Sequence, residues 1–133
     1  IIGRGKLDYE KRLHEIVKEL KIQNHVNFLG FVSEKNKFTE MAKSWFLLVP
    51  SSREGWGMIV PEANYSGTPA VVYNSSGLVD SARKYSKKNI ITEKNYEEIA
   101  DVLLKTIKPI KIEEKITPGW SELESFINKY EIR

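Results

Sequence analysis

The chain has 133 residues, 41% of them apolar, which suffices for the core of one domain or of part of a larger one. The formal net charge of +3 is too small for a domain that coats nucleic acid, and the absence of cysteine excludes disulfides, thiolate metal sites and cysteine nucleophiles. No apolar run approaches the roughly 20 residues of a membrane span, and the first residues lack a signal peptide's apolar segment, so we expect a cytoplasmic protein.

Short apolar runs alternate with amphipathic stretches along the chain. In chain order we expect a strand at 1–3, a helix at 8–20 capped by Asp8, a strand at 25–29, a helix at 33–43 capped by Ser33, a strand at 46–49, a helix at 57–66, a strand at 70–73, a helix at 77–84, a strand at 89–91 and a helix at 97–107. The run at 46–49 stops at Pro50 and is typical of a strand buried on both faces. The alternation predicts an α/β fold, a parallel sheet flanked by helices.

Ligands of such sheets bind beyond the carboxyl ends of the strands. We therefore expect the functional site among four loops, at 3–7, 30–34, 50–57 and 74–78. Further along, residues 108–118 are polar and carry two prolines, which predicts a linker before a last amphipathic helix. The predicted organisation is a domain at 1–108, followed by a linker and C-terminal helix at 109–133.

The most informative stretch runs from residue 50 to residue 63: a strand end, a small-residue loop and the start of a helix. Gly55 and Gly57 let a backbone approach a ligand closely or adopt a positive φ. The free N–H groups at the start of the helix favour phosphate. Glu54 precedes the helix and Glu62 lies about one and a half turns into it, so the two can contact different parts of one ligand. A helix-capping role for Glu54 and a solvated ion pair for Glu62 are the structural alternatives.

Four ordered blocks carry a resemblance to a known family: Val-Asn-Phe-Leu-Gly (26–30), Pro-Ser-Ser-Arg-Glu-Gly-Trp-Gly (50–57) with Glu62, Ser-Gly-Thr-Pro-Ala-Val-Val (66–72) and Ser-Ser-Gly-Leu-Val-Asp-Ser (75–81). Together they resemble the C-terminal, donor-binding domain of the retaining GT-B glycosyltransferases, a group that includes glycogen synthases and mannosyl- and glucosyltransferases. The pair of glutamates eight positions apart is specific only because of the blocks around it. The resemblance implies a Rossmann-like parallel sheet, here an incomplete GT-B C-terminal half.

The resemblance also implies a role for each matching residue. Glu54 would act at the catalytic centre by hydrogen-bonding the donor hexose, and Glu62 would bind the ribose hydroxyls. The remaining donor contacts would come from Gly55, Trp56, Gly57 and Met58 at the diphosphate and sugar, from Phe31, Val32 and Ser33 around the base, and from Ser76 and Gly77 on the sugar side. The implied substrate is a UDP- or GDP-sugar, transferred with retention, and neither a cofactor nor a metal is expected.

The sequence departs from the family pattern at its beginning. Family members have a further strand and helix before the segment that matches residues 1–3, and these supply an Arg and a Lys that neutralise the diphosphate. They also have an N-terminal domain that binds the acceptor, a sugar or a lipid-linked glycan. We therefore expect this chain to be a fragment of a hexosyltransferase for polysaccharide or glycolipid synthesis, inactive by itself.

Two other hypotheses stay open. One is a non-catalytic nucleotide-sugar-binding or assembly module that needs a partner chain or associates with itself. The other is a phosphate- or nucleic-acid-binding α/β domain that uses the basic cluster of Arg83, Lys84, Lys87 and Lys88, although the net charge argues against a nucleic-acid partner. The same cluster leaves open a peripheral contact with anionic lipid on the inner face of the membrane. The sequence does not identify the nucleotide, the sugar or the acceptor.

Overall fold

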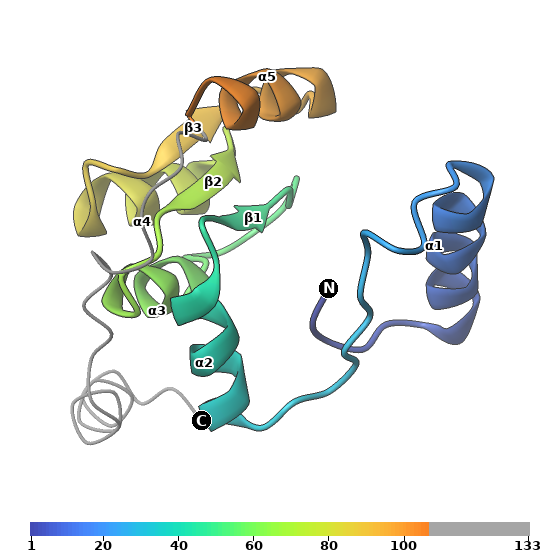
Figure 1. Ribbon diagram of the computed structural model, residues 1–133. Coiled ribbons are helices and arrows are strands. Elements are labelled where there is room, and N and C mark those ends of the chain that lie inside the picture. The colour runs from blue at the N-terminus through green and yellow to red at the C-terminus, as the bar shows by residue number, and fades with distance from the viewer. Residues whose placement is uncertain (107–133) are drawn as a thin grey trace. The chain divides into compact units, whose positions relative to one another are not determined.

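The computed structural model describes residues 1–106, so the expected linker and terminal helix at 109–133 lie outside the described residues. The elements, in chain order, are α1 (Leu7–Glu19), α2 (Glu34–Lys43), β1 (Leu47–Val49), α3 (Ile59–Tyr65), β2 (Ala70–Tyr73), α4 (Ser76–Tyr85), β3 (Ile90–Thr92) and α5 (Tyr96–Thr106) (Figure 1). Within residues 1–106 each expected helix is present, with its ends displaced by at most two residues.

The three strands form one parallel sheet in the order β1-β2-β3. Leu47 is in register with Ala70, and Val71 with Ile90. Parallel neighbours need crossover connections, and α3 and α4 supply them between successive strands. In the view of Figure 1, α3 lies below the strands and α5 above them. The predicted parallel sheet is therefore confirmed, and the carboxyl ends of its strands share one edge.

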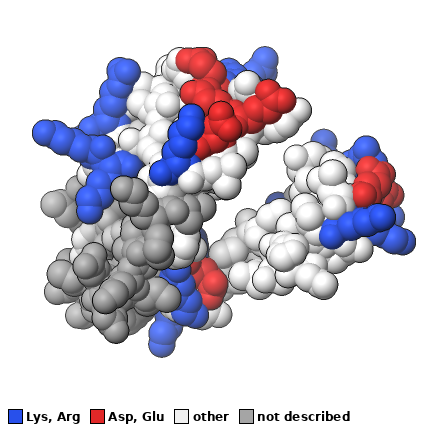
Figure 2. Space-filling model, turned by 45° about the horizontal axis from the view of Figure 1, so that its top comes forward, with Lys and Arg blue, Asp and Glu red and all other residues white. Residues whose placement is uncertain are grey.

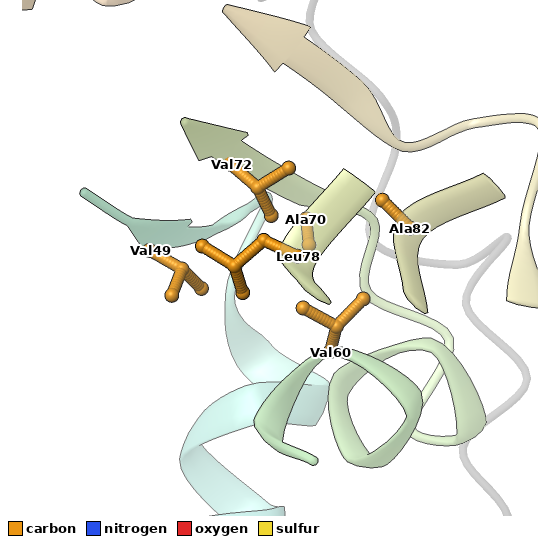
Figure 3. Packing of buried hydrophobic residues seen from close by; sticks show 6 residues of the cluster. All are labelled: Val49, Val60, Ala70, Val72, Leu78 and Ala82. Carbon is orange, nitrogen blue, oxygen red and sulfur yellow. The ribbon is translucent and has the colours of Figure 1, made fainter. Parts of the chain in front are cut away.

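The main core lies between the sheet and the helices α3 and α4. Ala70 and Val72 are two positions apart in β2 and therefore point to the same face, while Leu78 lies one helical turn before Ala82. Figure 3 shows these side chains converging with the other members of the cluster, and all of them are at most 9% exposed: Val49, Val60, Ala70, Val72, Leu78 and Ala82. This packing fixes where α3 and α4 begin, which is where the expected site lies.

The strand at 46–49 is not buried on both faces as its sequence predicts. Within β1 only Val49 is buried, and Leu48 is 45% exposed. Among the described residues β1 pairs with β2 alone, so it forms an edge of the three-stranded sheet. An edge position explains why an apolar run typical of a central strand remains accessible to solvent.

The segment between α4 and β3 is organised by the side chain of Asn89. Its amide donates to the Ala82 carbonyl oxygen over 2.9 Å and to Asn64 Oδ1 over 2.7 Å. Its oxygen accepts from the Ala70 backbone N–H and from Asn64 Nδ2, each over 2.8 Å. One side chain thus connects α3, β2 and α4 at the amino end of β3.

The chain divides into two compact units, Ile1–Lys37 and Phe38–Arg133. In the first unit, Ile2 and Gly30 form an isolated parallel bridge, and α1 has no buried residue. The strands expected at 1–3 and 25–29 are therefore wrong as regular strands, because a single bridge leaves most of their backbone groups without a ladder partner.

Two helix caps were expected from the sequence, and the structure confirms only one of them. Ser33 caps α2, because its Oγ accepts the Asn36 backbone N–H over 3.3 Å. Asp8 does not cap α1: the helix begins at Leu7, and Asp8 lies inside its first turn. An acidic residue in this turn still stabilises the helix through its macrodipole.

Candidate functional site

Three loops follow the carboxyl ends of β1, β2 and β3 and meet around one cavity of about 670 Å³. Its lining is polar and combines two cations, one carboxylate and several small side chains: Ser52, Arg53, Glu54, Gly55, Asn74, Ser75, Ser76 and Lys94. A cavity at this edge is where a parallel α/β sheet binds ligands. The lining can donate and accept hydrogen bonds and can hold an anionic group, so it fits a polar ligand.

The cavity brings together Glu54, Gly55 and Ser76 from the residues that the sequence singled out. Glu54 and Ser76 are exposed, so their side chains are open to a ligand from solvent. A carboxylate offers two acceptor oxygens and can bind two neighbouring hydroxyls of a sugar. The cations Arg53 and Lys94 line the same cavity.

The loops around the cavity are joined by side-chain hydrogen bonds. Ser75 Oγ donates to the Ser51 carbonyl oxygen over 3.0 Å, and Lys94 Nζ donates to the Ser52 carbonyl oxygen over 3.2 Å. Asn74 Nδ2 donates to Glu93 Oε1 over 3.0 Å. The β1–α3 loop is therefore held by both of the other loops.

Two of the predicted glycines are required by the packing of these loops. Gly57 is buried and has φ +63°, and a Cβ there would collide with Leu78 Cδ2. A Cβ on Gly77 would collide with the Gly55 carbonyl group. At Gly55, by contrast, nothing lies within 4 Å of an added Cβ. Gly57 and Gly77 thus serve the fold of the site, whereas Gly55 leaves open space beside the cavity.

Glu62 occupies a different environment from Glu54. It lies inside α3, is 4% exposed and does not line the cavity. Met58 precedes α3 at its N-cap position and is half-buried. The structure therefore does not bring the two glutamates to one open cavity.

Trp56 lies at the surface between the site and the end of α4. Its ring is 38% exposed and meets Tyr85 edge to face, with ring centroids 6.5 Å apart. Lys84 Nζ lies 5.3 Å from the Trp56 ring centroid, in cation–π geometry. The four members of the basic cluster are all exposed, and Figure 2 shows Lys and Arg side chains in separate groups on the visible face.

The residues expected around the base belong to the first unit. Phe31 is 74% exposed and lies under Arg4, whose Cζ is 5.7 Å from the ring centroid. Val32 is half-buried and Ser33 is exposed. The Arg4 segment, another of the expected loops, lines a separate cavity of about 440 Å³ inside this unit.

The loop after β3, which supplies Lys94, was not among the four expected loops. The signal was present, because the strand expected at 89–91 has its carboxyl end at the same edge of the sheet. Arg53 and Asn74 were within expected loops but were not singled out. Within residues 1–106 no cluster of three or more His, Asp or Glu side chains is arranged to hold a metal ion, and no helix combines the length and hydropathy needed to cross a membrane.

Comparison with known families decides what kind of protein carries this site. The model of the family described as glycosyl transferases group 1 matches residues 1–117. The chain belongs to the glycosyl transferases group 1 family. The chain is 30% identical over 122 residues to a poly(glycerol-phosphate) alpha-glucosyltransferase of Bacillus subtilis. The match covers 88% of the chain and 17% of the relative. The chain is 36% identical over 72 residues to the O-antigen chain mannosyltransferase RfbU of Salmonella typhimurium, covering 54% of the chain and 20% of the relative.

Two solved structures of Anabaena Alr3699/HepE resemble this family member in fold. The complex with UDP has a TM-score of 0.69 at 24% identity, covering 96% of the chain and 35% of the solved chain. The complex with UDP and glucose has a TM-score of 0.70 at 21% identity, covering 97% and 38%. The likeness confirms the Rossmann-like fold of a GT-B half, as expected from the sequence. The chain spans about a fifth of the length of the two curated relatives.

Proposed function

We propose that this chain is the donor-binding part of a longer hexosyltransferase. The enzyme would move a hexose from a UDP- or GDP-sugar to a sugar or lipid-linked acceptor, with retention of the anomeric configuration. The observation that carries the proposal is the polar cavity lined by Glu54 at the carboxyl edge of the sheet, in a member of the glycosyl transferases group 1 family. The UDP bound in two solved structures of one protein of the same fold supports a nucleotide-diphosphate sugar as the donor.

Glu54 is proposed to bind hydroxyls of the transferred hexose. Its carboxylate is exposed in the cavity, and Ser76 adds a hydroxyl that can donate and accept. Hydrogen bonds to an ionised acceptor are stronger than neutral ones and fix the orientation of the sugar ring. The contribution of Glu54 is therefore to place the anomeric carbon for attack.

The proposed chemistry asks for positioning and charge stabilisation rather than for a protein nucleophile. The leaving diphosphate would take the acceptor's proton on the face it departs from, which gives retention without a covalent intermediate. Among the residues that line the cavity, the cation Arg53 can attract the negatively charged donor. No metal is required by this scheme.

Glu62 is proposed to bind the ribose hydroxyls of the nucleotide. It lies on α3, directly beyond the loop that carries Glu54, and it is nearly buried in the structure. A ribose contact therefore requires that the surroundings of Glu62 open when the nucleotide binds. This requirement gives the two glutamates different experimental signatures.

The test compares Glu54→Gln with Glu62→Gln in the complete enzyme, since Gln keeps the shape of Glu and removes its charge. For Glu54→Gln we expect a loss of turnover of about 100-fold with nucleotide affinity retained, because a well-placed positioning contact is worth about this much. For Glu62→Gln we expect weaker binding of UDP or GDP in titration calorimetry. Glu97→Gln, an exposed change on α5, is the control. Wild-type kinetics and wild-type nucleotide affinity in both variants would contradict the proposed site.

A further inference from the structure

The loop that carries Glu54 is exposed, yet its backbone is fixed from one side by the start of α4. Residues 52–56 are all exposed. A loop with so little burial needs specific contacts to keep one conformation, because the hydrophobic core does not hold it. Within the loop, Ser51 Oγ donates to the Arg53 carbonyl oxygen over 3.0 Å. Further contacts come from the start of α4 and from the loops that precede α4 and α5.

The closest of these contacts is between Gly77 and Gly55. A Cβ on Gly77 would collide with the Gly55 carbonyl group and would lie 2.9 Å from the Glu54 carbonyl oxygen. Gly77 is the second residue of α4, where alanine is otherwise the better helix former. Its missing side chain is therefore explained by the approach of the Glu54–Gly55 backbone and not by the helix.

Two hydrogen bonds act on the same loop just before Glu54. Ser75 Oγ, partly buried, donates to the Ser51 carbonyl oxygen, and Lys94 Nζ donates to the Ser52 carbonyl oxygen. An ammonium group has three donors, so Lys94 keeps two beyond the bond to Ser52. These contacts hold the backbone before the glutamate, at residues 51 and 52, and at the glutamate and the residue after it, 54 and 55.

We propose that Gly77, Ser75 and Lys94 are positioning residues that set the backbone conformation at Glu54. Gly77 acts through the Gly55 carbonyl group and does not itself line the cavity. Its effect on sugar transfer rests on the proposed function of Glu54, whereas its effect on the loop conformation does not. The two parts can be measured separately.

The first measurement is the amide NMR spectrum of this chain, compared between Gly77→Ala and Asp80→Ala. Gly77→Ala must displace the loop, so we expect large changes of resonance at residues 53–56, far from the substitution in the sequence. Asp80→Ala is the matched control, because Asp80 lies on the same helix and is exposed. We expect it to change only resonances of α4. Resonances at 53–56 that stay unchanged in Gly77→Ala, as in Asp80→Ala, would overturn the proposal.

The second measurement is steady-state transfer by the complete enzyme. Ser75→Ala and Lys94→Met remove one hydrogen bond each without a steric clash, so they remain informative if Gly77→Ala does not fold. We expect each to lower kcat with little change in donor KM, and Lys94→Arg to restore kcat because guanidinium can donate to the same carbonyl. A misplacement near 1 Å can cost about 100-fold, which is the loss expected for Gly77→Ala.

The outcomes distinguish this proposal from the proposed function. If the loop resonances move in Gly77→Ala while Glu54→Gln keeps wild-type turnover, the positioning contacts are supported and the role of Glu54 is rejected. Unchanged loop resonances in Gly77→Ala, Ser75→Ala and Lys94→Met would overturn the positioning role, whatever Glu54→Gln does. A donor KM that rises in Lys94→Met and is not rescued by Arg would also overturn it for Lys94, because that result marks a direct donor contact.

Discussion

Gly57 illustrates how a single backbone conformation determines the entry into α3. Its φ of +63° lies in the left-handed region, and the Leu78 side chain fills the space where a Cβ would point. The sequence places Gly57 in a glycine-containing loop, but either ligand approach or positive φ would explain it. The structure shows that the fold itself favours this glycine, because both the dihedral angle and the Leu78 side chain disfavour alanine.

We expect Gly57→Ala to lower the free energy of unfolding by about 2 kcal/mol, the sum of a left-handed alanine and a crowded contact with Leu78. Urea denaturation measures the change. Gly55→Ala, which meets no atom and has no left-handed φ, should stay within about 0.5 kcal/mol of wild type. Equal stability of both variants would show that the Leu78 contact and the backbone angle carry no cost.

At the scale of elements, the helices follow their sequence pattern more closely than the strands do. A helix closes its hydrogen bonds within itself, so apolar residues at helical spacing predict its place. A strand needs a neighbour, and the segment at 25–29 has only two backbone hydrogen bonds with Ile1 and the isolated bridge that follows it at Gly30. The sequence of that segment therefore predicts only a tendency to form a strand, and a regular strand also requires a paired neighbour.

The side-chain amide of Asn89 joins several helices and strands, and the sequence did not predict these contacts. In the structure it joins α3, β2 and α4 through bonds that use both ends of the amide. No local pattern indicates such a role, because its partners Asn64 and Ala70 are distant in sequence.

We expect Asn89→Ala to destabilise the protein by about 2–3 kcal/mol, because the Ala70 N–H and the Asn64 amide lose partners in a half-buried place. Asn89→Asp should also destabilise, since a carboxylate cannot donate to the Ala82 carbonyl oxygen. Lys88→Ala, an exposed change next to it, is the control. Equal free energies of unfolding for Asn89→Ala and Lys88→Ala, measured by thermal or urea unfolding, would contradict this role.

At the scale of the whole molecule, the two units differ in how much core they contain. The second unit holds the core cluster on one face of β2, and both Val71 and Val72 of that strand are fully buried. The first unit has α1 without a buried residue, and its clearest packing contact is the His14 ring against the Phe28 ring, with centroids 4.0 Å apart. A 13-residue helix with so little burial is marginal by itself.

We therefore expect backbone amides of α1 to exchange with solvent far faster than those of β2. Hydrogen exchange followed by mass spectrometry on this chain measures the difference. Local opening of α1 needs little loss of buried surface, whereas exchange at Val71 and Val72 requires the second unit's core to open. Equal protection in α1 and β2 would contradict this prediction.

The sequence by itself determined the helices, the parallel α/β class, the glycosyltransferase family and the loop that carries Glu54. These follow from periodicity and from short motifs, which act over a few residues and need no tertiary contact. Only the tertiary structure decided that Gly77 packs on Gly55, that Lys94 shares the cavity of Glu54 and that Glu62 is buried away from it. Those facts depend on residues far apart in the chain, which meet only when parallel strands align their carboxyl ends along one edge.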